Sequence, residues 1–166
     1  MSNKVKETDV VIIGAGPVGL FAVFELGLLD MKCDVIDILD KPGGQCAELY
    51  PDKPIYDIPG IPEISGGELT KSLLEQIKPF NPKFHLSTIV SELKQINNDL
   101  WEVVTDSDKI FHTKVIVIAA GGGSFQPKKP PIDGIDDYEG KSVFYSIKNI
   151  EKFYNKESAI VGGAVS

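Results

Sequence analysis

An apolar run that leads into three spaced glycines constrains this chain more than any other feature of its sequence. Asp9–Ile13 is mostly aliphatic, and it is followed by Gly14, Gly16 and Gly19 in the pattern Gly-x-Gly-x-x-Gly. Such a run predicts a buried parallel strand, and a proline at the first turn predicts a helix, which we place over Pro17–Asp30. The glycines then lie on the turn between the strand and the helix.

Each glycine has a separate role in a turn of this kind. Gly14 allows the tight turn out of the strand, Gly16 leaves room for a pyrophosphate to approach backbone N–H groups, and Gly19 lets the helix pack close to the sheet. The amino-terminal end of the helix carries unpaired N–H groups and a partial positive charge, so it favours an anion. The triplet taken alone fits a plain strand-turn-helix about as well as a phosphate site.

An acidic residue at the right distance favours the second interpretation. A second apolar stretch, Cys33–Ile36, ends at Asp37, which lies 23 residues after Gly14. This is close to the spacing expected for a carboxylate that accepts hydrogen bonds from ribose hydroxyls. Strand, triplet, helix, strand and acid together predict a site for the ADP half of a dinucleotide. A 2′-phosphate would be repelled by Asp37, so this is not expected to be an NADP site.

The middle of the chain predicts a loop, a helix and an antiparallel insertion. Prolines dominate Tyr50–Pro62, whereas Ser65–Lys78 has the apolar spacing of a helix. Three short runs follow, and two short turns separate them, so the strands must be antiparallel and form a β-meander with Trp101 packed under it. The three runs are Thr88–Ile96, Leu100–Asp106 and Lys109–Lys114.

A continuous apolar run, Val115–Ala120, then predicts a central parallel strand that is covered on both faces. It ends at Gly121–Gly123, which we expect near the nucleotide because ligands bind beyond the carboxyl ends of such strands. After the proline-rich loop Phe125–Gly134, we expect a short strand at Ser142–Tyr145 and a helix over residues 147–154.

The last predicted strand is Ser158–Val161, which leads into Gly162 and Gly163 as an echo of the first motif. Ile160 and Val161 would form an apolar strand without parallel neighbours. Such a strand must fray, aggregate or pair with another chain.

Composition is that of a soluble globular domain with one sizeable core. The chain has 166 residues, of which 42% are hydrophobic and 25% charged, with a net charge of −7. This charge argues against a nucleic-acid surface or an anionic membrane as a partner. Val10–Leu29 contains a single charge, Glu25, but its glycines and proline favour the soluble interpretation over a membrane span. We find no targeting segment, and we expect a cytoplasmic protein.

The cysteines and histidines predict no metal site and no catalytic centre. Cys33 and Cys46 are 13 positions apart and have neither Cys-x-x-Cys nor zinc or iron–sulfur spacing, so a reducing compartment is the simpler assumption. Gly-Gly-x-Cys at Cys46 resembles the start of the redox disulfide in glutathione-reductase-like flavoenzymes. In that group a second cysteine follows a few residues later, but Pro51 stands at that place here and residues 47–52 contain no cysteine, so we expect no redox disulfide. His85 and His112 have no nucleophile or carboxylate near them in sequence, and we expect both to be structural or solvent-facing.

Together these motifs resemble those of the thioredoxin-reductase-like, pyridine nucleotide-disulfide oxidoreductase-like flavoproteins. Within that group the chain looks most like the ferredoxin/flavodoxin–NADP⁺ reductases of thioredoxin-reductase type. The likeness runs along nearly all of the chain, but it covers only about half of a complete family member. Besides the glycine triplet and Asp37, it rests on Gly43-Gly44-Gln45, the loop Leu49–Asp57, Ala119–Gly121 and Gly162-Gly163.

The resemblance implies an α/β fold, a FAD-binding Rossmann-like parallel sheet with an inserted three-stranded antiparallel β-meander. Residues 1–125 would be the first segment of the FAD-binding domain. Residues 126–156 would be a linker and crossover, and residues 157–166 the first strand of a truncated NADPH-binding domain.

The resemblance also implies roles for single residues. Asp37 would hold the adenosine ribose, Gln45 and Tyr50 would line the pyrophosphate and flavin side, Val90 would meet the adenine through its backbone, and Phe125 would lie by the cofactor. Core packing for Val90, a sheet cap for Phe125 and a surface aromatic for Tyr50 remain as alternatives. The expected cofactor-binding residues are Gly14, Gly16, Pro17, Gly19, Asp37, Gly44, Gln45, Tyr50, Val90, Gly121 and Phe125.

The family reaction is hydride transfer from NADPH to FAD, followed by electron delivery to ferredoxin or flavodoxin. Because the rest of the NADPH domain and a returning FAD segment are absent from this sequence, we expect weak FAD binding and no turnover by this chain alone. The alternatives are a non-catalytic adenine-dinucleotide-binding module, a non-functional truncated remnant and, among enzymes, a thioredoxin reductase-like protein. The resemblance leaves a homodimer open.

Overall fold

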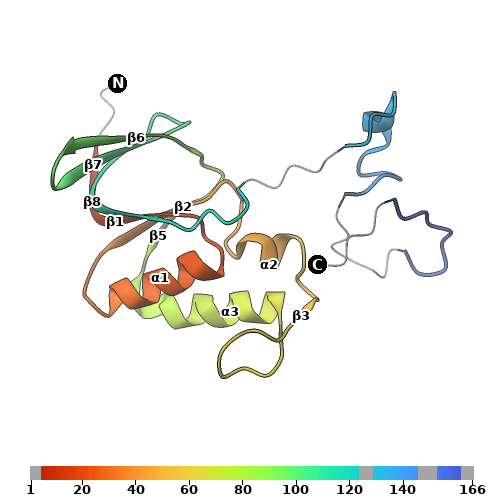
Figure 1. Cartoon of the computed structure of the whole chain (residues 1–166), viewed down its shortest axis with the longest axis horizontal. Helices are drawn as coiled ribbons and strands as arrows, with labels where there is room; N and C mark the ends of the chain where they lie inside the picture. Colours follow the sequence, from red (N-terminus) through yellow and green to blue (C-terminus); the bar gives the residue numbers. More distant parts are fainter. Residues whose placement is uncertain (1–4, 124–128, 146–152, 162–166) are drawn as a thin grey trace. The chain divides into compact units, whose positions relative to one another are not determined.

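A computed structural model describes residues 5–123, 129–145 and 153–161 of the chain. The chain divides into two compact units, Met1–Gln126 and Pro127–Ser166, which are described separately. The first unit contains nearly all of the regular structure (Figure 1).

The first unit is built on one six-stranded sheet with the strand order β5-β2-β1-β8-β7-β6. The pairs β1·β2, β1·β8 and β2·β5 are parallel, whereas β6·β7 and β7·β8 are antiparallel. This confirms the predicted α/β fold with an antiparallel meander. The six strands are β1 (Lys6–Ile13), β2 (Cys33–Ile36), β5 (Lys83–His85), β6 (Val90–Asn97), β7 (Leu100–Thr105) and β8 (Ile110–Ile118).

Helices α1 (Pro17–Gly27) and α3 (Gly66–Ile77) lie side by side against one face of the sheet (Figure 1). Alternate residues of β1 explain this arrangement, because successive strand side chains point to opposite faces. Val10 and Ile12 pack toward the helices with Leu20 and Leu73, and all four side chains are buried. Val11 belongs to a second core cluster, with Ile36, Val103 and Phe111.

One strand joins the meander to the parallel sheet. Sequence patterns placed a boundary between Lys114 and Val115, but the structure shows β8 as a continuous nine-residue strand. Its first part pairs with β7 as far as Thr113, and its whole length from Phe111 to Ile118 pairs with β1. The expectation of cover on both faces is wrong at its carboxyl end, where Val115 is 40% and Ile118 70% exposed. In this unit β7 stops short of these residues, so no neighbouring strand covers them on that edge.

Helix α3 begins where the sequence predicts it to begin. The hydroxyl of Ser65 accepts a hydrogen bond from the N–H of Glu68, and the Glu68 carboxylate accepts one from the N–H of Ser65. This reciprocal capping box satisfies two backbone donors that the first helical turn would leave unpaired. The buried stripe of α3 includes Leu69, Leu73 and Ile77, as its apolar spacing predicts.

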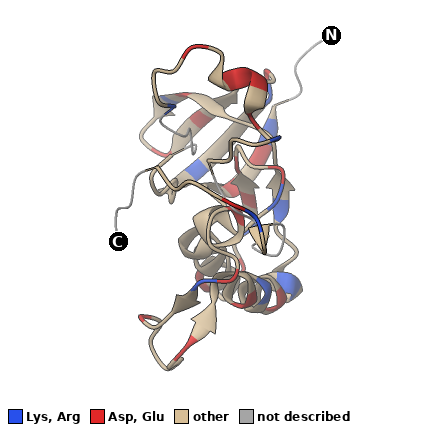
Figure 2. Ribbon diagram, turned by 90° about the vertical axis from the view of Figure 1, so that its right-hand side faces the viewer, with Lys and Arg blue, Asp and Glu red and all other residues tan. Residues whose placement is uncertain are grey.

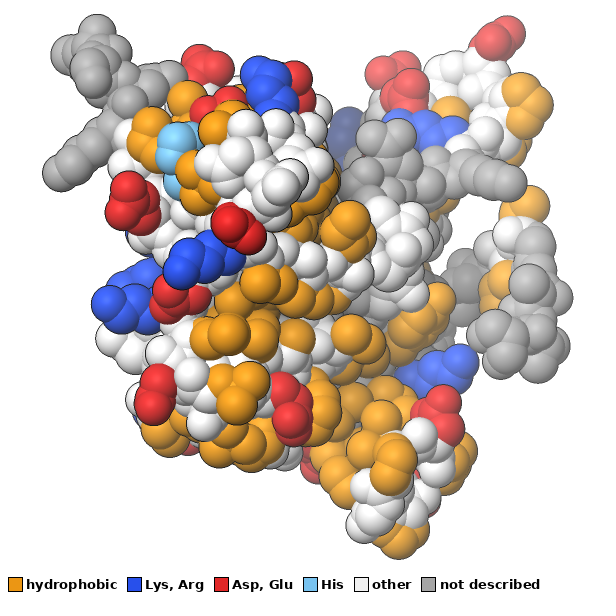
Figure 3. Space-filling model, turned by 60° about the vertical axis from the view of Figure 1, so that its left-hand side comes forward, with side chains coloured by type: hydrophobic (Ala, Val, Ile, Leu, Met, Phe, Trp, Pro, Cys, Tyr) orange, Lys and Arg blue, Asp and Glu red, His pale blue; other side chains and the backbone are white. Residues whose placement is uncertain are grey.

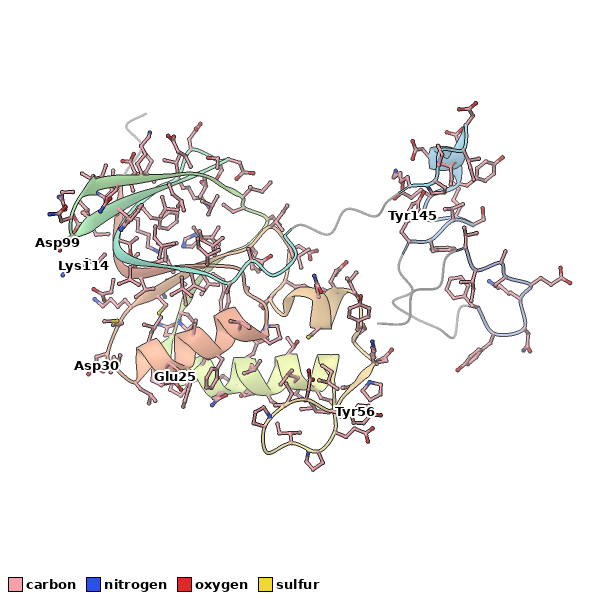
Figure 4. All side chains as sticks on the ribbon, in the orientation of Figure 1. Glu25, Asp30, Tyr56, Asp99, Lys114 and Tyr145 are labelled. Carbon is pink, nitrogen blue, oxygen red and sulfur yellow. The ribbon has the colours of Figure 1, made fainter. Side chains whose placement is uncertain are left out.

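Short elements lie between the main strands and α3. Helix α2 (Gly44–Glu48) follows β2, and the proline-rich loop contains the two-residue strand β3 (Pro54–Ile55), which pairs with β4 (Ile64–Ser65). The one-turn 3-10 helix η1 (Lys78–Phe80) ends α3. Figure 4 shows Tyr56 beside β3 and Asp99 at the tip of the β6–β7 hairpin. Trp101 is half-buried on β7 rather than fully enclosed.

The second unit has little regular structure in the part that the structure describes. Its named element is the 3-10 helix η2 (Ile135–Tyr138). The predicted strand at Ser142–Tyr145 is wrong, because only an isolated bridge between Glu139 and Val143 forms there. Most of the predicted helix over 147–154 lies outside the described residues. The predicted strand Ser158–Val161 does not form, and Ile160 and Val161 are 89% and 90% exposed, because no described segment of this unit pairs with them.

Charge is spread over the described surface, with acidic and basic residues interspersed along the ribbon (Figure 2). Hydrophobic side chains are also exposed on one face (Figure 3). Phe21 on α1 is 47% exposed, and Leu29, in the turn after α1, is 69% exposed. Across the described ranges, no helix is both long and apolar enough to span a bilayer. The apolar stretch Val10–Leu29 is divided between a strand, a turn and an 11-residue helix.

Candidate functional site

A cavity of about 440 Å³ lies at the carboxyl ends of the parallel strands in the first unit. This volume falls within the range of about 300–1,000 Å³ that is usual for small-molecule sites. Four segments that are far apart in sequence meet there, and most of the lining groups are glycines or apolar side chains. The lining residues are Ile13, Gly14, Gly16–Val18, Ile36–Leu39, Gly44–Cys46, Glu48, Leu49, Thr88–Val90 and Ala119–Gly123.

The turn after β1 forms one wall of this cavity. Gly14 has a φ angle of +108°, and a β-carbon there would lie 2.3 Å from the carbonyl oxygen of Ala119, so this position requires glycine. The N–H of Gly14 donates to the carbonyl of Ile36 at 2.8 Å, and the N–H of Ala119 donates to the carbonyl of Ile13 at 2.8 Å. The turn is therefore fixed between the ends of β2 and β8.

Gly16 provides the test of whether a phosphate group fits. A β-carbon at Gly16 would meet only the Cα of Gly44 among protein atoms, at an ordinary contact distance of 3.8 Å. The protein therefore leaves open the space that a side chain would fill, in the wall of the cavity. Gly16 also precedes Pro17, the first residue of α1, and the described residues provide no side-chain cap for this helix end. The arrangement fits a pyrophosphate on backbone N–H groups.

Gly19 has a different role, as the sequence predicts. A β-carbon there would lie 1.9 Å from the carbonyl oxygen of Gly14. Gly19 therefore lets α1 pack against the turn, and it does not line the cavity. Its contribution to the site is the position of the helix.

Asp37 follows β2 directly and lies at the cavity wall. Its Oδ2 accepts the N–H of Ala15 at 2.6 Å, and its Oδ1 accepts the N–H of Leu39 at 2.8 Å. An ionised carboxylate has about four lone-pair positions, so each oxygen keeps acceptor capacity for a further donor such as a ribose hydroxyl. Asp37 can thus fix the turn and bind a ligand with the same group.

The Gly43-Gly44-Gln45 motif adjoins this turn, and Gly44 and Gln45 line the cavity. Gly43 adopts a left-handed conformation, with φ of +119°, and its N–H donates to the carbonyl of Ala15 at 2.8 Å. This bond brings the start of α2 against the turn after β1. Gln45 is exposed, and its Nε2 lies 3.1 Å from where a β-carbon of Gly122 would be. Gln45 therefore reaches across to the glycines that follow β8.

The end of the cavity near Asp37 has an apolar lining. Ile38 and Ile89 are 38% and 45% exposed and both line the cavity with Val90. Thr88 is buried, and its N–H donates to the carbonyl of Asp37 at 3.0 Å. Sequence reasoning missed Ile38 and Ile89, although their positions directly after an acid and at a strand start were a usable signal.

Not every predicted residue lies at the cavity. Gly14, Gly16, Pro17, Asp37, Gly44, Gln45, Val90 and Gly121 line it. Tyr50 is 45% exposed beside the Lys53 ammonium, which lies 5.3 Å from the centre of its ring, and it is absent from the lining. Phe125 lies outside the described residues, as do Gly162 and Gly163.

The cysteines lie in different environments. Burial, with the nearby Asp34 and Asp9 charges, raises the pKa of the Cys33 thiol to about 11, which suits an inert core residue. Cys46 lines the cavity, and burial together with the charge of Asp57 raises its pKa as well. Both thiols are free, and no group of three possible metal ligands occurs among the described residues.

Both histidines have carboxylate partners that the local sequence does not reveal. His85 Nε2 lies 2.6 Å from Asp34 Oδ1, and His112 Nε2 lies 3.2 Å from Glu102 Oε2. The partners are on neighbouring strands of the sheet, 51 and 10 residues away in sequence, which is why local sequence showed neither pair. Neither histidine lines the cavity.

Comparison with known proteins gives the family. The family described as pyridine nucleotide-disulphide oxidoreductase matches residues 8–166. The chain belongs to this family. Family membership implies a flavin cofactor, and the expected resemblance to flavoproteins of this type is thereby confirmed.

Two curated relatives and one solved structure illustrate the likeness. The chain is 62% identical over 166 residues to the ferredoxin–NADP reductase of Parvibaculum lavamentivorans, and 63% identical over 166 residues to that of Bradyrhizobium sp. strain ORS 278. It covers 48% of each of these proteins. The structure of thioredoxin reductase from Streptococcus pyogenes MGAS5005 matches with a TM-score of 0.62 and 26% identity, over 85% of this chain and 42% of that one. The chain thus spans about half the length of the curated relatives that it matches.

Proposed function

We propose that this chain is the FAD-binding part of a ferredoxin–NADP reductase of thioredoxin-reductase type. The observation that carries the proposal is the meeting of the glycine turn, Asp37, the Gly-Gly-Gln motif and the glycines after β8 around one cavity. Identity of 62–63% to proteins named ferredoxin–NADP reductase supports the same reading. In the complete protein, the reaction would be hydride transfer from NADPH, followed by electron transfer to ferredoxin or flavodoxin.

Different residues at the cavity would contact different parts of the cofactor. Asp37 would accept from the adenosine ribose, and Ile38, Ile89 and Val90 would surround the adenine. Backbone N–H groups at the start of α1 would take the pyrophosphate, with Gly16 leaving room for it. The Gln45 amide would lie toward the flavin side. A bound flavin supplies the redox chemistry, and the protein supplies position and electrostatics.

This chain by itself would bind FAD reversibly and would not turn over. The described residues after position 128 contain one 3-10 helix and no strand, so they provide no second dinucleotide fold. Ile160 and Val161, which the family resemblance assigned to that fold, are almost fully exposed. NADPH would therefore lack a site, and a half-enclosed flavin would bind weakly because affinity depends on excluding water.

Titration of the purified chain tests the proposal. We expect FAD and ADP to bind and FMN to bind much more weakly, because FMN lacks the ADP half. Flavin fluorescence for FAD and FMN, and calorimetry for ADP, would measure this. Equal binding of FMN and FAD would contradict the proposed site. NADPH-dependent dye reduction at rates typical of flavoenzymes would contradict the expectation of no turnover.

A further inference from the structure

A partly buried cluster of polar side chains, centred on the buried Asp34, lies outside the cavity lining. Asp34 on β2 is 3% exposed, and its Oδ1 is bonded to the ammonium of Lys6 on β1 and to His85 Nε2 on β5. The ring of His85 packs edge-to-face on Phe111, with the ring centres 4.9 Å apart. Asp34 thus lies on the face of the sheet that carries the second core cluster, opposite the helices.

The cluster is joined to the candidate site through His85. The backbone carbonyl of His85 accepts the N–H of Asp37 at 3.0 Å. Two further backbone hydrogen bonds join the same segments. The N–H of Ser87 donates to the carbonyl of Leu39 at 2.9 Å, and the N–H of Thr88 donates to the carbonyl of Asp37 at 3.0 Å. Residues 85–88 therefore hold the backbone of the segment that presents the Asp37 carboxylate.

The strand that carries His85 is weakly held by its backbone alone. β5 is an edge strand of three residues, with three register pairs to β2. Short edge strands have marginal stability unless side chains add to the pairing. The 2.6 Å bond from His85 to Asp34 is such an addition, because it ties the last residue of β5 to the centre of β2.

We propose that His85 is a positioning residue for Asp37: its bond to Asp34 fixes the end of β5, and through it the backbone that presents the ribose-binding carboxylate. This inference rests on the proposed function, because it assumes that Asp37 binds the ribose of an adenine nucleotide. His85 itself makes no contact with the ligand.

Substitution of His85 tests the inference in the 166-residue chain. His85→Leu removes the bond to Asp34, and we expect it to weaken ADP binding about three- to tenfold, the range of one net hydrogen bond. His85→Gln keeps an Nε2 donor and should restore most of the affinity. His112→Leu is the matched control, because His112 is paired in the same way with Glu102 on β7 but is not bonded to Asp37; ADP affinity should be unchanged.

Two readouts separate positioning of Asp37 from general loss of stability. The ratio of ADP to 2′-deoxy-ADP affinity reports the contact with the ribose, so His85→Leu should lower this ratio as Asp37→Asn does. In the Asp37→Asn background, His85→Leu should cause little further loss, because coupled residues are not additive. All titrations are made below the melting transition of each variant. If His85→Leu does not fold, His85→Ala, which also lacks the bond to Asp34, takes its place with the same expected loss.

The outcomes are distinct. Full ADP affinity and an unchanged ribose ratio in folded His85→Leu would overturn this inference and leave the proposed function standing. Fully additive losses in the double variant would also overturn it, because His85 would then act independently of Asp37. Absence of ADP and FAD binding by the unaltered chain would overturn both the inference and the proposed function.

Discussion

The carboxylate of Asp37 accepts the backbone N–H of Ala15, with Oδ2 and the nitrogen 2.6 Å apart. Ala15 is fully buried in the glycine turn, and Asp37 is the first residue after β2. The acid that would hold the ribose therefore also fixes the loop that would hold the phosphates. Ligand binding and the shape of the loop depend on the same group.

Asp37→Ala should weaken FAD binding about 10- to 100-fold, because hydrogen bonds to a charged group are worth about 1.5–3 kcal/mol. The variant should also melt at a lower temperature, since the buried N–H of Ala15 loses its acceptor. Fluorescence titration well below the melting temperature measures the first effect, and calorimetry measures the second. Unchanged flavin retention by Asp37→Ala would contradict the site.

Gly16→Ala and Gly19→Ala should change different properties: the first should weaken FAD binding, and the second should lower the stability of the fold. At Gly16 the added methyl group would meet no protein atom closer than 3.8 Å, so the fold should keep its stability while FAD binding falls at least tenfold. At Gly19 the methyl group would lie 1.9 Å from the Gly14 carbonyl oxygen. That clash should cost about 1–3 kcal/mol of unfolding free energy or more. Chemical denaturation beside FAD titration would show whether the two effects separate.

The buried Asp34 should make stability fall at low pH. Burial raises the pKa of the Asp34 carboxyl, but the hydrogen bonds from Lys6 and His85 outweigh burial and hold this pKa below its ordinary value of 3.8. As pH falls, the unfolded chain therefore takes up the proton before the folded chain does. The stability that the ionised Asp34 contributes is complete above its ordinary pKa and is lost as the pH falls below that value toward the folded-state pKa.

Asp34→Asn should therefore be less stable than the unaltered chain at pH 7, by about 1–2 kcal/mol. This difference should shrink as the pH is lowered from about 4 toward the folded-state value. Denaturant titrations at a series of pH values measure it. Asp99→Asn, at the exposed hairpin tip in Figure 4, is the control and should track the unaltered chain. A stability gap that is constant over this pH range would exclude the mechanism.

Ser65→Ala should lower the unfolding free energy by about 0.5–2 kcal/mol, because it removes the capping box of α3. FAD affinity should not change, because no residue of α3 lines the cavity. Thermal melting and FAD titration of the same sample would check both statements. A large loss of FAD affinity would show that α3 is coupled to the cavity.

Sequence patterns were sufficient for the parts of the site that depend on local conformation. Gly14 has the positive φ that a tight turn needs, and Asp37 falls at the strand end that its spacing indicates. Both follow from one βαβ unit, in which strand, turn and helix are neighbours in sequence. The apolar spacing predicted α3 from Ser65 for the same reason, because it too is a local pattern.

Features that depend on distant partners were beyond these patterns. His85 and Asp34 are 51 residues apart and meet only because β5 pairs with β2. The continuity of β8 past Lys114 depends on its pairing with β1, which no local pattern contains. Ser158–Val161 has an apolar strand pattern but forms no strand, because short strands need a partner.

Because β8 pairs with strands on both sides, it should not tolerate a one-residue deletion. It pairs Phe111 with Val103 of the meander at one end and Ile118 with Ile13 at the other. Deleting one residue inside β8 would shift its remaining length by about 3.3 Å and reverse which side chains face the core. The glycines after β8 would then lose their place in the cavity wall, whereas an epitope tag inserted at Asn98, between β6 and β7, would leave them in place.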